Sequence, residues 1–263
     1  MSSISNPPLH PSILLLNPNS SESMTLGILE AAEKMHLPQR IHLSAYTAPP
    51  SSPRSINDGS DLELSTEVVY NDIKSKTLLS AHDAILVACF SVHPLVKALS
   101  SLSTNNKPII TGIFESSILT CLSLLSPTGK WGIVTTGQFW EFHLTSGVNS
   151  FLGITDPHAS NAKFAGVEST GLNASDFHGG VSQEEIRHRL REATRRLLRK
   201  GNIECVVMGC AGMAGLEEII REVAQEEYGE KGKEVCVVDG VRAGVSVLEQ
   251  AVRSRRAFRG VGG

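Results

Sequence analysis

The amino-acid sequence predicts an α/β fold made of two similar lobes, each with a mainly parallel sheet. Short β-rich apolar runs alternate with longer stretches of helical period, a pattern typical of βαβ units. Several segments of the first half of the chain also match segments of the second half, at a nearly constant distance along the sequence. This repeat indicates a duplicated architecture. The chain has 263 residues, of which 41% are hydrophobic and 19% charged, so it is long enough to bury a sizeable core.

Strands and helices are expected to alternate along the chain. Each expected strand is a short apolar run bounded by turn or cap residues, and each expected helix has helical hydrophobic periodicity, several after a Ser or Asn cap. The expected strands are residues 13–16, 40–45, 84–88, 108–111, 131–135, 163–167, 205–208 and 234–238. The expected helices are residues 22–35, 63–79, 115–125, 138–151, 183–200, 216–228 and 242–253. Two polar segments, 46–61 and 169–182, are expected to be loops, and loops as long as the first are often functional.

The repeat is the most informative feature of the sequence. Residues 83–89 (DAILVAC) align without a gap on residues 204–210 (ECVVMGC). At nearly the same displacement, residues 13–17 match 132–136, and residues 107–112 match 233–239. We therefore assign residues 12–114 and 241–256 to a first lobe, 115–240 to a second lobe, and 1–11 and 257–263 to flexible termini.

Each lobe carries a cysteine, Cys89 or Cys210, at the end of an equivalent apolar strand. Open α/β sheets bind ligands at the carboxyl ends of their strands, so the two thiols are expected to face each other across a cleft between the lobes. A single cysteine in such a place is more often a small buried hydrophobe, but the pairing favours catalysis. The turn-prone residues and the helix that follow each cysteine are expected to favour thiolate over thiol. Cys121, Cys205 and Cys236 lie inside apolar stretches and are expected in the core.

Two opposed thiols suit proton transfer at a carbon next to a carbonyl. One thiolate removes the proton, and the other thiol delivers a proton to the opposite face. The enolate formed between these steps needs hydrogen-bond donors, which the backbone after each cysteine, the loop 17–21, Thr135 and Thr136 are placed to supply. The same Asn-Pro-Asn-Ser loop is also explained as a turn and helix cap, and the two interpretations are compatible.

Charge and hydropathy exclude several other classes of function. The net charge of −3 and the scattered Lys and Arg give no electrostatic footprint for nucleic acid or anionic lipid. The basic run 187–200 has helical spacing with Glu and Leu and is expected to be a solvated helix face. No stretch approaches the roughly 18 uninterrupted apolar residues of a membrane span, and the first residues lack the features of a signal peptide. The protein is therefore expected to be soluble and cytoplasmic.

Motifs for other chemistries are absent from the sequence. It contains no G-x-S-x-G elbow, Walker loop or G-x-G-x-x-G after a strand. The nine histidines are dispersed without zinc-ligand spacing, and the five cysteines show neither a CxxC pair nor a disulfide framework, so free thiols and no metal are expected. His93 lies four residues after Cys89, and a surface or helix-cap role is favoured over a catalytic one.

Six segments together resemble the hydantoin racemase branch of the Asp/Glu racemase superfamily, which includes allantoin racemases. They are residues 17–20 (NPNS), 88–90 (ACF), 112–115 (GIFE), 134–136 (VTT), 209–213 (GCAGM) and 239–241 (DGV), in the expected order across nearly the whole chain. The resemblance implies two Rossmann-like lobes with the active site between them, and Cys89 and Cys210 as the acid/base pair. It also implies that no cofactor is needed and that the chain forms a homo-oligomer, a dimer, tetramer or hexamer.

Carried over to matching positions, the resemblance also implies a set of substrate contacts. These are Asn17, Ser55, Ile56, Phe90, Ser91, Thr135, Thr136, Ala211 and Gly212. The chain departs from the family where many hydantoin racemases read Gly-Asp-Pro after Cys-Phe, because residues 91–94 read SVHP here. This departure bears on the substrate more than on the mechanism, since both thiols are present.

The expected function is cofactor-independent racemisation of a 5-substituted hydantoin or allantoin, a reaction of purine or nitrogen metabolism. Alternatives within the superfamily are an amino-acid racemase for Asp or Glu, or a maleate-isomerase-like enzyme in which a cysteine acts as a covalent nucleophile. Retention of both cysteines argues against a decarboxylase with one thiol. A non-catalytic protein that closes its two lobes on a metabolite is the alternative from another class.

Overall fold

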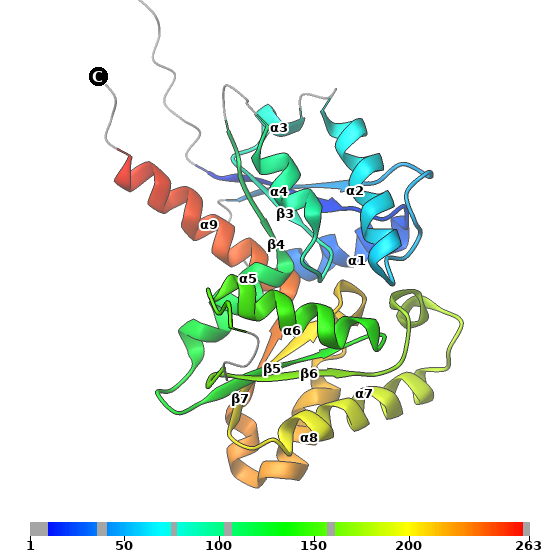
Figure 1. The fold of residues 1–263 in the computed structure, drawn as a ribbon, viewed down its shortest axis with the longest axis vertical. Helices are drawn as coiled ribbons and strands as arrows, with labels where there is room; N and C mark the ends of the chain where they lie inside the picture. The colour runs from blue at the N-terminus through cyan, green and yellow to red at the C-terminus, as the bar shows by residue number, and fades with distance from the viewer. Residues whose placement is uncertain (1–9, 36–40, 75–77, 103–106, 157–160, 260–263) are drawn as a thin grey trace, which may run out of the picture.

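The computed structural model describes residues 10–35, 41–74, 78–102, 107–156 and 161–259, and it contains two parallel four-stranded sheets. The strand order is β2-β1-β3-β4 in the first sheet and β6-β5-β7-β8 in the second. The sheets lie in opposite halves of the molecule, with α5, α6 and α9 between them (Figure 1). The predicted α/β class with two lobes is confirmed.

The strands follow the predicted runs closely. They are β1 (Ser12–Asn17), β2 (His42–Thr47), β3 (Ala84–Val87), β4 (Ile109–Gly112), β5 (Lys130–Thr135), β6 (Phe164–Ser169), β7 (Ile203–Gly209) and β8 (Cys236–Asp239). The two sheets share one topology, so that β1 corresponds to β5 and β3 to β7. The repeat in the sequence therefore marks equivalent strands, and the two cysteines follow the equivalent pair, β3 and β7.

The helices are α1 (Glu22–Glu33), α2 (Gly59–Ile73), α3 (Leu78–Ala81), α4 (Pro94–Ser100), α5 (Ile113–Leu124), α6 (Phe139–Phe151), α7 (Gln183–Leu198), α8 (Glu217–Tyr228) and α9 (Gly240–Phe258). Short 3-10 helices lie at η1 (Ala174–His178), η2 (Ala211–Met213) and η3 (Gly229–Glu234). Among the described residues, no helix is both long and apolar enough to cross a bilayer.

Several boundaries differ from the sequence prediction because a cap sets them. Helix α2 begins four residues earlier than expected, since the Asp58 side chain accepts hydrogen bonds from the Ser60 and Asp61 N–H groups. Helix α4 was not predicted, and it starts at a proline after a His93 cap. Helix α9 is longer than expected at both ends, and the Asp239 side chain caps its start. Residues 1–9 and 260–263 of the predicted flexible termini lie outside the described residues.

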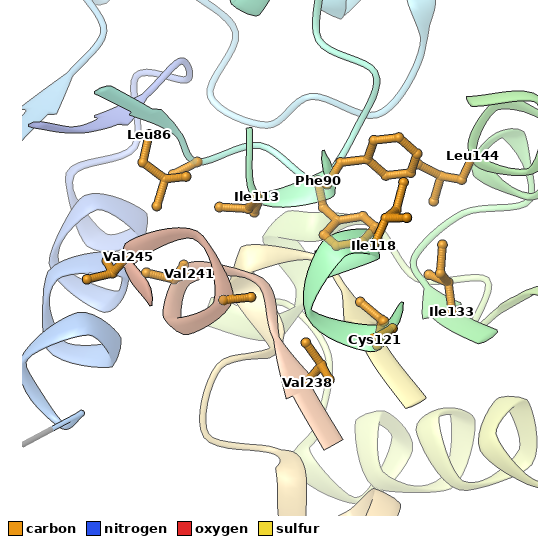
Figure 2. Packing of buried hydrophobic residues seen from close by; sticks show 14 of the residues in the cluster. Leu86, Phe90, Ile113, Ile118, Cys121, Ile133, Leu144, Val238, Val241 and Val245 are labelled. Carbon is orange, nitrogen blue, oxygen red and sulfur yellow. The ribbon is translucent and has the colours of Figure 1, made fainter. Parts of the chain in front are cut away.

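Each sheet packs helices on both faces. In the first sheet, Leu14, Leu16, Ile85 and Val87 face a core with α2 and α4, whereas Ile13, Leu15 and Leu86 face α1 and α9. In the second sheet, Val134, Val206 and Met208 face a core with α7 and α8, whereas Ile133 and Val207 join the same cluster as Ile13 and Leu15. This shared cluster runs through both lobes, and Figure 2 shows Leu86, Ile118, Ile133 and Val245 within it.

Helices α5 and α9 each cross from one lobe to the other. Helix α5 follows β4 of the first sheet but packs on β7 and β8 of the second, while α9 follows β8 and packs on β3 and β4. The two helices also contact each other. Burial of either helix therefore stabilises both lobes and fixes how they face each other.

Close packing of α9 on the first sheet gives a testable consequence at Gly244. A Cβ atom added there would lie 2.4 Å from Leu86 Cδ1, and Leu86 is fully buried. We expect Gly244→Val to lower the free energy of unfolding by about 1–3 kcal/mol, the usual cost of overpacking a core. Urea unfolding measures this change. Ser246→Val, on the exposed side of the same helix, is the matched control, and an equal loss in both variants would contradict the packing argument.

Candidate active site

Cys89 is held at the carboxyl edge of the first sheet by a tight turn. The Ala88 N–H donates to the Leu16 carbonyl at 2.8 Å, which continues the ladder past the end of β3. The Ser91 N–H then bonds back to the Cys89 carbonyl at 3.0 Å, and the His93 N–H to the Ser91 carbonyl at 2.8 Å. The chain therefore turns sharply between β3 and α4, and the sulfur stays at the sheet edge.

Cys210 occupies the equivalent place in the second sheet. It follows β7 directly and caps η2, and its sulfur accepts a hydrogen bond from the Gly212 N–H at 3.3 Å. The preceding residue, Gly209, has no space for a side chain, because a Cβ atom would lie 2.7 Å from Ile133 Cγ2. Close approach of β5 and β7 therefore sets the position of this second thiol.

Both thiols line one pocket of about 410 Å3, a volume that includes the part open to solvent. The lining consists of Asn19, Met24, Ile56, Ala88, Cys89, Phe90, Thr136, Trp140, Ala174, Gly209, Cys210, Ala211 and Gly212. It brings together both proposed catalytic cysteines and five of the proposed contacts: Ile56, Phe90, Thr136, Ala211 and Gly212. Four other proposed contacts, Asn17, Ser55, Ser91 and Thr135, are not among the lining residues.

Three of these four residues lie close behind the pocket wall. The Ser91 hydroxyl is buried and donates to the Cys89 sulfur at 3.4 Å. The Thr135 hydroxyl is buried and donates to the Gly209 carbonyl at 2.9 Å. Asn17 is also fully buried, beneath the loop that follows β1. Ser55 is half-buried, and its hydroxyl bonds within its own loop.

Asn17 fixes the orientation of Asn19, which does line the pocket. The Asn19 side-chain oxygen accepts from Asn17 Nδ2 at 3.0 Å and from the Ser21 N–H at 2.9 Å. Because two donors point at this oxygen, the hydrogen-bond network assigns the other end of the amide as the NH2 group. Its Nδ2 atom lies 3.1 Å from the sulfur of Met24, a weak acceptor that also lines the pocket. Asn19 thus presents a hydrogen-bond donor to the pocket.

Sequence reasoning did not identify Met24, Trp140 or Ala174 as lining residues. Met24 and Trp140 lie on the apolar faces of α1 and α6, and hydrophobic periodicity does not separate a core position from a pocket position. Ala174 lies in η1, inside the segment 169–182 that was predicted to be a loop. No signal in the sequence marked it.

Burial dominates the electrostatics of both thiols. The pKa of Cys89 is raised to about 12, mainly by burial and to a smaller extent by the nearby Cys210 and Glu115, while the Ser91 hydroxyl acts in the opposite direction. Burial also raises the pKa of Cys210 to about 11, against the N–H groups of Gly212 and Met213. The expectation that these surroundings favour thiolate over thiol is therefore wrong. Helix α4, which follows Cys89, has only seven residues, and η2, which follows Cys210, has only three. Their N–H donors lower the thiol pKa values by less than desolvation raises them.

His93 is a buried helix cap. Its Nδ1 atom accepts a hydrogen bond from the Leu95 N–H at 3.3 Å, and its ring lies against Ser65 and Thr66 of α2. Burial lowers the pKa of His93 to about 3, so the ring is neutral near pH 7. The predicted cap role is correct, a surface position is wrong, and the ring is not among the pocket-lining residues.

The described lining of the pocket carries no ionisable side chain other than the two thiols. Within the described part of the chain, no group of three or more His, Cys, Asp or Glu side chains has an arrangement that fits a metal ion. The polar side chains of the lining besides the thiols are Asn19 and Thr136, and the rest is apolar or backbone. The arrangement is suited to a small neutral molecule held between two thiols.

The chain is similar to known proteins over most of its length. The model of the Asp/Glu/Hydantoin racemase family matches residues 13–248. An uncharacterized protein of Schizosaccharomyces pombe is 32% identical over 249 residues, which cover 92% of each chain. A hydantoin racemase of Pseudomonas sp. is 28% identical over 240 residues, covering 91% of this chain and 85% of the relative. Allantoin racemase from Klebsiella pneumoniae has the same fold, with a TM-score of 0.73 at 23% identity over 93% of this chain and 88% of that one.

The raised pKa values predict slow alkylation of Cys89 and Cys210 in the free protein, because only the thiolate reacts. A thiol with a pKa of about 11 is ionised in roughly one molecule in ten thousand at pH 7, against a few per cent for an ordinary cysteine. The rate of reaction with iodoacetamide, followed by peptide mass spectrometry, should therefore rise about tenfold per pH unit from pH 7 to 9. A rate already constant by pH 7 would mean a resident thiolate and would contradict this expectation.

Proposed function

The chain belongs to the Asp/Glu/hydantoin racemase family, a family of isomerases, and we propose that it is a cofactor-independent racemase of a 5-substituted hydantoin or of allantoin. The observation that carries this proposal is the pair of thiols, Cys89 and Cys210, in a single pocket whose described lining has no other ionisable side chain. The thiols support the type of reaction, and the uncharged lining supports the class of substrate.

A neutral cyclic diamide suits this lining better than an acyclic amino acid does. Aspartate or glutamate would bring an ammonium group and two carboxylates into the pocket, and buried charges need partners. Met24, Ile56 and Trp140 instead offer apolar surface to a planar ring, while Asn19 and Thr136 offer hydrogen bonds to its carbonyl and N–H groups. The name of the relative from Pseudomonas sp. and that of the structural neighbour support the same class.

In the proposed reaction one sulfur begins as a thiolate and the other as a thiol. The thiolate removes the proton from the stereogenic ring carbon, and the electron pair of that C–H bond moves into the adjacent carbonyl to form an enolate. The opposite thiol then gives its proton to the other face of the same carbon. The two sulfurs exchange ionisation states and the product is the mirror image, so protons and electrons balance without a cofactor.

The cost of ionisation explains why hydrogen-bond donors are needed in the pocket. Forming a thiolate from a thiol with a pKa of about 11 costs about 5 kcal/mol at pH 7. Once formed, a poorly solvated thiolate is a stronger base than an ordinary cysteine thiolate in water. Donors aimed at the enolate oxygen lower the remaining barrier, and the candidates are the Asn19 amide and the backbone N–H groups after each cysteine.

We expect Cys89→Ser and Cys210→Ser each to lower kcat by at least about 100-fold, because positioned acid/base groups contribute roughly 10²- to 10⁴-fold. A hydroxyl is a much weaker acid than a thiol but has similar volume, so the fold should be retained. The measurement is the loss of circular dichroism of single enantiomers of allantoin and of a panel of 5-substituted hydantoins, against a buffer blank. In heavy water, the racemised product should carry deuterium at the stereocentre.

Cys236→Ser is the matched control, because this thiol lies outside the pocket, and it should keep wild-type turnover. Near-normal activity in either pocket variant would refute the two-thiol mechanism. An unchanged signal of the wild-type protein across the whole panel would instead favour a non-catalytic binding protein.

The orientation of the Asn19 amide gives a second expectation. Asn19→Asp keeps the shape of the side chain but replaces its NH2 group with a second acceptor, so kcat should fall by roughly 10²- to 10³-fold while KM changes little. Ser23→Ala, at an exposed position on the neighbouring helix, should leave both constants unchanged. An Asn19→Asp variant that loses only substrate affinity would show that the amide binds the ground state rather than the enolate.

A further inference from the structure

The three cysteines outside the pocket converge on one place in the second lobe. Cys121 comes from α5, Cys205 from β7 and Cys236 from β8, and we call this group the distal thiol cluster. Cys121 and Cys205 are fully buried, whereas Cys236 is partly exposed. The sequence prediction of a core position therefore holds for the first two and holds in part for Cys236, which packs against the core cluster but is partly exposed.

The geometry of the sheet brings these sulfurs together. Cys205 and Cys236 are register partners on neighbouring parallel strands, so their side chains point to the same face of the sheet. Neighbouring strands lie about 4.8 Å apart, and disulfides join residues whose Cα atoms are about 4.4–6.8 Å apart. Helix α5 packs on β7 and β8, and Cys121 approaches Cys205 from that helix. The pKa of Cys205 responds to both Cys121 and Cys236, which places the three sulfurs near one another.

Solvent reaches the cluster at Cys236, the one partly exposed thiol of the three. Cys236 lines a surface hollow of about 840 Å3 together with Arg221 and Arg242, and the hollow is open to water. A small polar oxidant therefore meets Cys236 first, with Cys205 directly behind it. Cys205 is the register partner of Cys236 on the neighbouring strand, so its sulfur is the thiol placed to react with Cys236 in a second step.

We propose that the distal thiol cluster is an oxidation site, at which hydrogen peroxide converts Cys236 and Cys205 into a reversible disulfide. The Cys236 sulfur attacks one peroxide oxygen, the O–O bond breaks, and a sulfenic acid and one water are formed. The Cys205 sulfur then attacks the Cys236 sulfur, the S–O bond breaks, and a second water leaves. Two thiols lose one electron each, and one peroxide is reduced to two waters. A dithiol reductant reverses the bond by thiol–disulfide exchange.

This site is separate from the racemase chemistry, because none of its three thiols lines the pocket of Cys89 and Cys210. The proposal therefore stands or falls independently of the proposed reaction.

The test is peroxide treatment of the full-length protein, followed by blocking of free thiols, digestion without reductant and mass spectrometry. We expect a linked pair of peptides that contain Cys205 and Cys236, a loss of two titratable thiols, and recovery of both with dithiothreitol. The double variant Cys89→Ser with Cys210→Ser should give the same linked pair, since the pocket thiols take no part.

Single variants assign the roles within the cluster. Cys236→Ser should abolish the linked pair, whereas Cys121→Ser should retain it. A Cys89–Cys210 link alone, or irreversible sulfinic acid at Cys236 without any link to Cys205, would overturn the proposal. A Cys121–Cys205 link in wild-type protein in place of the Cys205–Cys236 link would overturn it as well. The linked peptides found in the wild-type protein test the proposal even if a variant fails to fold.

Discussion

The exchange of helices α5 and α9 between the lobes is the constraint on which the rest of the structure depends. Each helix leaves one sheet and packs on the other, and the two pack on each other, so a single apolar cluster runs through both halves of the molecule. The carboxyl edges of the two sheets are thereby held on either side of one pocket. Two cysteines that are far apart in the sequence thereby line the same small pocket.

The burial that positions the thiols also sets their chemistry. Desolvation raises both pKa values by more than the nearby donors lower them, so both thiols are neutral near pH 7. Because the proposed reaction begins with one thiolate, one of the two sulfurs must lose its proton before the C–H bond is broken. The Ser91 hydroxyl behind Cys89 and the Gly212 N–H beside Cys210 are then available to the sulfur that ionises.

Sequence reasoning succeeds here where the physical signal is local or repeated. The two matching apolar runs before Cys89 and Cys210 identify equivalent strands. The features that predict a strand here lie within a few residues of one another: the length of the run, its β-branched residues and the turn that follows. It fails where the role of a residue depends on the direction or the burial of its side chain in the folded protein. Asn17 and Asn19 belong to the same polar loop, and only the folded turn directs one inward and the other into the pocket.

The same limit applies to residues whose role depends on distant parts of the chain. Trp140 has the spacing of an ordinary core residue on α6, and its exposure to the pocket depends on the opposite lobe. The thiolate expectation failed because desolvation is a property of the assembled site. Likewise, the contact between Cys121, Cys205 and Cys236 follows from helix-on-sheet packing that no local pattern encodes.

The uncharged lining has a kinetic consequence as well. A neutral ligand experiences no long-range attraction from such a pocket, so its capture is governed by diffusion, orientation and the shape of the opening. Added salt has no steering field to screen during this encounter. The free energy of desolvation then determines which molecules enter the pocket. This free energy is modest for a ring amide and large for an ion.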